Sequence, residues 1–163
     1  MRRVANQKTV ILIVLGLMTA LASIVYSHCQ IPCGIYNDPA RFDMLAEHIT
    51  TIEKSMKQIT GLSKQDKPNM NQITRWVNNK ENHTDELSHI VTYYFMAQRI
   101  KLVNKSQGKA YEDYIRKLTL LHEILIYSMK AKQTTDLSNV EKLRSLLTEF
   151  RVAYFRADDT HKY

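Results

Sequence analysis

Glycine and proline are scarce in this chain of 163 residues, which contains four Gly and three Pro. All-β folds need many tight turns, so this scarcity argues against them. With 44% hydrophobic and 24% charged residues, the composition is ordinary for one compact domain, which disfavours a two-domain enzyme, a disordered chain and a fibrous chain. Leu, Ile, Lys, Gln and Glu are abundant instead, and they favour helices. We therefore predict an all-α domain.

Three basic residues near the N-terminus precede an uncharged apolar run over residues 10–25. This layout, with small residues near Ser27, predicts a leader over residues 1–27 and export of the mature protein to the periplasm or the extracellular space. Cleavage after Ser27 leaves 136 residues and lowers the formal charge from +7 to +4. An uncleaved membrane anchor is the alternative, because residues 9–26 approach the roughly 20 residues that span a bilayer. Basic residues are spread rather than clustered with aromatics, so no nucleic-acid partner is expected.

Four segments carry apolar residues at spacings of three and four, which is typical of amphipathic helices. Asp38 is expected to cap the first helix, with Pro39 at its first position, and residues 60–68 form the first loop. The second helix is expected over about 69–98, and Asp136 or Ser138 can cap the fourth. The four stripes are Phe42, Leu45, Ile49, Ile52, Met56 and Ile59; Ile73, Trp76, Lys80, His83, Leu87, Ile90 and Tyr94; Tyr111, Tyr114, Leu118, Leu121 and Leu125; and Val140, Leu143, Leu147, Phe150 and Tyr154. We predict an antiparallel up-and-down four-helix bundle over residues 38–163, preceded by an irregular segment at 28–37.

Both cysteines lie in the irregular segment, which reads His28-Cys29-Gln30-Ile31-Pro32-Cys33-Gly34-Ile35-Tyr36. Cleavage after Ser27 would free the amine of His28. That amine, the Cys29 amide nitrogen and the two thiolates form a square-planar N₂S₂ donor set, with the His28 imidazole as a fifth, axial donor. Such a set suits Ni(II) or Cu(II) better than tetrahedral zinc.

A Cys29–Cys33 disulfide is the competing interpretation, and it is the usual one for two cysteines in an exported protein. With an uncleaved N-terminus, the chain would then be a membrane-anchored helical interaction or sensor domain. The two interpretations differ in the first residue of the mature protein.

The pattern His28-Cys29-x-x-Pro32-Cys33-Gly34-x-Tyr36 resembles the nickel-binding hook of the nickel superoxide dismutase family, whose mature chains begin at that His. The similarity extends to residues 76–81 and 93–95. The resemblance implies a four-helix bundle, one nickel ion per chain, a homohexamer and disproportionation of superoxide to oxygen and hydrogen peroxide. A maturation protease and a nickel chaperone are the further partners that it implies.

The resemblance also implies roles for individual residues. His28, Cys29 and Cys33 would be the nickel ligands, and Pro32 would set the turn between the thiolates. Tyr36 would stand over the open face of the metal as a catalytic residue.

Three further residues, Tyr94, Gln30 and Lys80, bear on this resemblance. Tyr94 resembles the second tyrosine that supports the first, and we count it among the catalytic residues. Gln30 stands where the family commonly has an acidic residue, and the Glu and Arg that position the axial imidazole in some members have no unambiguous match. Lys80 is our candidate for this missing support, because its stripe places the charge inward, although its ammonium could instead extend to the surface.

Overall fold

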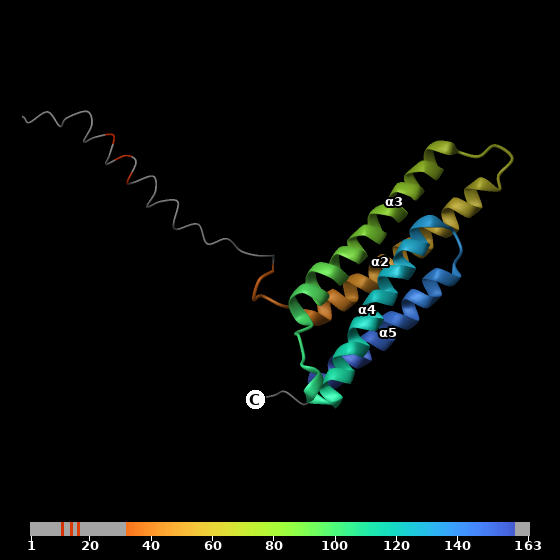
Figure 1. Cartoon of the computed structure of the whole chain (residues 1–163). Helices are drawn as coiled ribbons and strands as arrows, with labels where there is room; N and C mark the ends of the chain where they lie inside the picture. Colours follow the sequence, from red (N-terminus) through yellow and green to blue (C-terminus); the bar gives the residue numbers. More distant parts are fainter. Residues whose placement is uncertain (1–10, 12–13, 15, 17–31, 159–163) are drawn as a thin grey trace, which may run out of the picture. The chain divides into compact units, whose positions relative to one another are not determined.

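The computed structural model describes residues 32–158, together with the isolated positions 11, 14 and 16 (Figure 1). The chain divides into two compact units, residues 1–34 and 35–163. The predicted leader, its cleavage point and two of the three predicted metal ligands, His28 and Cys29, lie outside the described residues. No helix in the described part of the chain is long and apolar enough to cross a membrane.

The second unit is a bundle of four long helices, as predicted (Figure 1). They are α2 (Asp38–Ser63), α3 (Met70–His89), α4 (Lys109–Gln133) and α5 (Ser138–Asp158). Helix α3 continues into a π-helix, η1 (Ile90–Arg99), and a short 3₁₀ turn, η2 (Lys105–Gln107), precedes α4. Helix α2 packs against α3 and α5, and α4 packs against the same two helices. This neighbour order is that of an up-and-down bundle.

The first helix differs from the prediction at both ends. Its cap is Asn37 rather than Asp38, because the Asn37 side chain accepts a hydrogen bond of 3.1 Å from the Ala40 amide. The Asp38 carboxylate is therefore available for other partners. At the other end, α2 runs on to Ser63, through the start of the predicted loop, and the Ser63 hydroxyl donates to the Ile59 carbonyl at 2.7 Å.

The core consists of the apolar stripes of the four helices. All six predicted residues of α2 are buried, and the ring of Phe42 lies 5.0 to 5.5 Å from four aromatic rings: Phe95, Phe150, Tyr154 and Phe155. The predicted stripe of α4 is partly wrong, since Leu121 is buried but its other four members are only half-buried. Leu120, Ile124 and Ala131 are buried instead, so the inward face of α4 is rotated from the predicted one.

Two histidines meet between α2 and α3. The Nδ1 atoms of His48 and His83 lie 2.8 Å apart, so one ring must donate and the other accept. Burial, and then the neighbouring His83, hold the pKa of His48 below its usual value, while Glu86 and Glu47 act in the opposite direction. His83 therefore has a polar partner within the bundle, which explains its place on the predicted stripe.

Candidate metal centre

The described part of the predicted hook begins with a turn over residues 32–34 and continues without regular secondary structure to residue 36. Gly34 has a φ of +84°, a conformation that side-chain-bearing residues rarely adopt, and Cys33 is exposed. The pairing of Cys29 with Cys33 falls outside the described residues, so both interpretations of the two thiols stay predictions. Within the described residues, no group of three or more His, Cys, Asp or Glu side chains is placed to hold a metal ion.

The two predicted catalytic tyrosines lie side by side in the bundle unit. The rings of Tyr36 and Tyr94 meet edge to face with their centroids 5.8 Å apart. Tyr36 is 38% exposed, whereas Tyr94 is 4% exposed. Tyr36 follows Cys33 by three positions in the sequence. The ring that is open to solvent therefore belongs to the chain segment next to the predicted thiolate ligand.

The tyrosine pair is attached to a network around the Asp38 carboxylate. Arg99 donates from Nε to Oδ1 at 2.8 Å and from Nη2 to Oδ2 at 2.6 Å, which is a two-point ion pair. The Tyr94 hydroxyl donates to Oδ1 at 2.6 Å, and the Tyr154 hydroxyl donates to Oδ2 at 2.8 Å. Asp38 thus connects the first residue of α2 to η1 and to α5.

Two guanidinium groups cover the tyrosine rings. The Arg99 Cζ atom lies 4.5 Å from the centroid of the Tyr36 ring, and the Arg41 Cζ atom lies 5.0 Å from that of Tyr94. A cation over an aromatic face is attracted by the negative charge of that face. Asp38 offsets one of the two positive charges, so these groups together leave one positive charge beside the tyrosines.

The network sets the protonation states of its members. Burial raises the pKa of Asp38, but the hydrogen bonds from Arg99, Tyr94 and Tyr154 outweigh it, so this pKa lies below its usual value. Burial and the bond to Asp38 raise the pKa of Tyr94 to about 12 and also raise that of Tyr154. At neutral pH, Asp38 is therefore an anion and both phenols keep their protons.

Sequence reasoning found Tyr36 and Tyr94 but missed the residues that hold them. Asp38 had been assigned to the helix cap and Tyr154 to the core, and Arg99 had no assignment. The spacing explains the omission of Arg99, because it follows Tyr94 by five residues rather than three or four, and α-helical periodicity places such residues about 140° apart. A π-helix has more residues per turn, which brings residues five apart closer to one face, and no motif in the sequence predicted a π-helix here.

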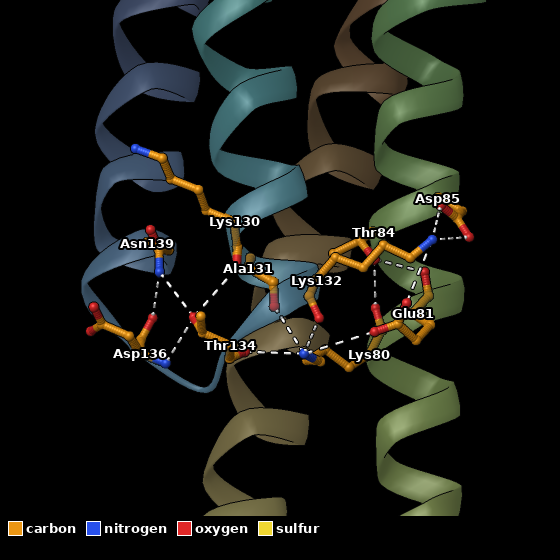
Figure 2. A network of polar contacts seen from close by, with 10 residues as sticks. All are labelled: Lys80, Glu81, Thr84, Asp85, Lys130, Ala131, Lys132, Thr134, Asp136 and Asn139. Carbon is orange, nitrogen blue, oxygen red and sulfur yellow. Dashed lines mark hydrogen bonds and ion pairs between the residues drawn. The ribbon is translucent and has the colours of Figure 1, made fainter.

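Lys80, the predicted support for the axial imidazole, is buried in the middle of α3, the helix that continues into η1. Its ammonium donates to three backbone carbonyls at the C-terminal end of α4: Ala131 at 3.1 Å, Lys132 at 2.5 Å and Thr134 at 3.0 Å (Figure 2). Glu81 lies 3.8 Å from the same nitrogen. A positive charge at the C-terminal end of a helix also complements the helix dipole. Lys80 thus caps α4.

Lys80 and Tyr94 are well separated. Tyr94 follows Lys80 by fourteen positions along one helical segment, which corresponds to about 21 Å of rise at the α-helical value. The described residues give Lys80 a structural partner at α4 and no contact with the tyrosine pair, and its role beside a metal stays a prediction.

Replacing Lys80 by Met tests the capping role. The stem is retained while three carbonyls lose their donor, so we expect the free energy of unfolding to fall by about 2–4 kcal/mol. Lys132→Met is the control, because Lys132 is half-exposed and its ion pair with Asp85 is on the surface; that change should cost less than about 1 kcal/mol. Urea denaturation measures both values. Unchanged stability of Lys80→Met together with loss of bound metal would instead place Lys80 beside the metal.

Replacing Asp38 by Asn tests the network. The amide keeps the shape but leaves Arg99 without its counter-charge, so we expect a loss of about 2–4 kcal/mol at pH 7. Because the pKa of Asp38 is lower in the folded than in the unfolded state, wild-type stability should fall as the pH drops below about 3.9, and the variant should lack this contribution. Asp43→Asn is the control, since Asp43 is exposed on the same helix. Equal losses in the two variants would contradict the account.

Comparison with known proteins identifies the family. The model of the nickel-containing superoxide dismutase family matches residues 23–158, from just before His28 to the end of α5. No curated protein and no solved structure gives a significant match. The match covers most of the chain and includes both the hook motif and all four bundle helices. The chain therefore belongs to the nickel-containing superoxide dismutase family, and it is an oxidoreductase that acts on superoxide.

Proposed function

We propose that the protein disproportionates superoxide to oxygen and hydrogen peroxide at one nickel ion per chain, held by a mature N-terminus that begins at His28. The observation that carries this proposal is the hook motif over residues 28–36 within the family match. The family supports the activity and the metal. The starting residue, the ligand set and the stoichiometry follow from the resemblance of the hook motif and are part of the proposal.

The chemistry of the donor set fits nickel. A terminal amine, an amide nitrogen and two thiolates are strong donors suited to square-planar coordination, and His28, Cys29 and Cys33 supply them within six residues. Cys33 is exposed on the described turn, so its sulfur is accessible to a ligand. Pro32 and Gly34 flank it, and the positive φ of Gly34 allows the chain to reverse there.

When bound, nickel supplies the one-electron exchange with superoxide. The chain's own residues control access, charge and protons around that exchange. The Tyr36 side chain is partly exposed, and it follows the turn that carries Cys33. It can therefore limit which molecules approach the metal and can order water there. Tyr94, whose hydroxyl donates to Asp38, packs against that ring in an edge-to-face arrangement. Peroxide formation consumes two protons, and either water ordered by Tyr36 or a cysteine sulfur that has taken up a proton from solvent can deliver them.

Charge around the tyrosine pair favours an anionic substrate. Arg41 and Arg99 lie over the two rings, and Asp38 neutralises only one of them. The remaining positive charge attracts superoxide and should make the rate fall as ionic strength rises.

We extend the proposal to processing and assembly. A protease removes residues 1–27, the mature protein is exported, a nickel chaperone delivers the metal, and six chains assemble. Ile35 and Leu102, which are 83% and 87% exposed in the single chain, are apolar side chains that an assembly could cover. The mass of the native assembly tests the hexamer.

Adding one Ala before His28 tests the use of the terminal amine. The extension turns this amine into an amide, a much poorer donor, while every side chain is retained. We expect the extended mature protein to lose nickel binding and superoxide dismutation and to keep its helical content. The measurements are nickel content, dismutation rate and circular dichroism, with native-start and extended proteins prepared in parallel under reducing conditions.

Cys33→Ser, and separately Cys29→Ser, supply the matching side-chain controls. Each should abolish nickel binding and leave the bundle folded, because the hook precedes the four apolar stripes. Native nickel content and rate in the Ala-extended protein would contradict the amine ligand. Loss of helicity without loss of nickel in the Ser variants would favour the structural disulfide.

A further inference from the structure

Arg99 has no role in the proposed ligand set, yet it contacts Tyr36, the last residue of the hook motif. Its Cζ atom lies over the Tyr36 ring, 4.5 Å from the ring centroid, and its nitrogens donate to Asp38 and Tyr154. We propose that Arg99 is a positioning residue that holds the Tyr36 ring in place beside the nickel site. The proposal rests on the function proposed above and deepens it.

Because the Arg99 guanidinium is planar, it can contact the Tyr36 ring and hydrogen-bond Asp38 at the same time. Nε and Nη2 use one edge for the two oxygens of Asp38, and Nε also donates to the Tyr154 hydroxyl at 3.1 Å. The N–H groups of a guanidinium lie in its plane, so hydrogen bonds of this kind leave its face available to an aromatic ring such as that of Tyr36. A lysine ammonium has no such face, so Lys could keep the charge but not the stacking.

The π-helix brings the two supports of Tyr36 to the same place. Tyr94 and Arg99 both bond to Asp38 although they are five residues apart in η1. The Ile100 amide donates to the Phe95 carbonyl at 2.8 Å, which is the i to i−5 bond of a π-helix. Because the π-helix has a wider turn, residues five apart approach the same face. The irregular helix therefore places the Tyr94 ring and the Arg99 guanidinium against the same tyrosine, Tyr36.

The bundle core holds Arg99 in place. Arg99 is pinned by Asp38 at the start of α2 and by Tyr154, which is 6% exposed, on α5. Tyr36 itself has only its ring contacts with Arg99 and Tyr94 among the interactions described above. Its orientation thus depends on residues from η1, and through them on two other helices.

The test uses protein expressed with its native leader and purified after processing, with and without nickel. The variant is Arg99→Lys, and Arg144→Lys is the charge-matched control, since Arg144 is exposed and pairs with Glu53. The readouts are nickel content, kcat and KM for superoxide, and the aromatic NMR cross-peaks of Tyr36, which are identified by their absence in Tyr36→Phe.

We expect Arg99→Lys to bind nickel like the wild type, to shift and broaden the Tyr36 cross-peaks in both metal states, and to lower kcat about ten- to hundredfold through misplacement of the ring. Arg144→Lys should match the wild type in every readout. Wild-type Tyr36 cross-peaks or wild-type kcat in Arg99→Lys would overturn the proposal, and so would a loss of thermal stability with the Tyr36 cross-peaks unchanged.

Failure of the proposed function would look different. Wild-type protein without nickel or without dismutation would refute that function, while the Tyr36 cross-peaks of the nickel-free protein still decide whether Arg99 holds the ring.

Discussion

The described site depends on the hydrogen bonds and the ion pair that the Asp38 carboxylate makes. This carboxylate receives hydrogen bonds from Tyr94 and Arg99 on η1 and from Tyr154 on α5, and it belongs to the first turn of α2. One anion thus joins three helices at the point where the chain leaves the hook segment. It is available because Asn37 caps the helix in its place. Without it, Arg99 would be a half-buried charge with no ionic partner, and the cation over Tyr36 would lose its anchor.

The architecture was predictable because it depends on periodicity. Apolar spacings of three and four in four segments were sufficient to predict the bundle and the complete buried stripe of α2. The hook motif was equally visible, since its residue types are adjacent in sequence. Apolar periodicity and a contiguous motif can both be recognised in the sequence without knowledge of tertiary contacts.

Contacts between residues distant in sequence and departures from regular helix geometry could not be predicted from the sequence. Arg99 lies 61 positions from Asp38, and the π-helix that aligns it with Tyr94 breaks the 3.6-residue period. Lys80 was correctly expected to face inward, but only the structure shows that the carbonyls at the end of α4 are what it meets. An inward charge indicates that a partner exists without indicating which one.

The central claim is that the mature chain begins at His28 and that its terminal amine is a ligand of the catalytic nickel. Intact-mass spectrometry combined with metal analysis of active protein tests this claim most directly. Protein purified after expression from the full-length chain should have the mass of a 136-residue polypeptide starting at His28 and should contain one nickel ion per chain. An intact Met1 terminus in active material, or full activity with manganese, iron or copper in place of nickel, would contradict the account.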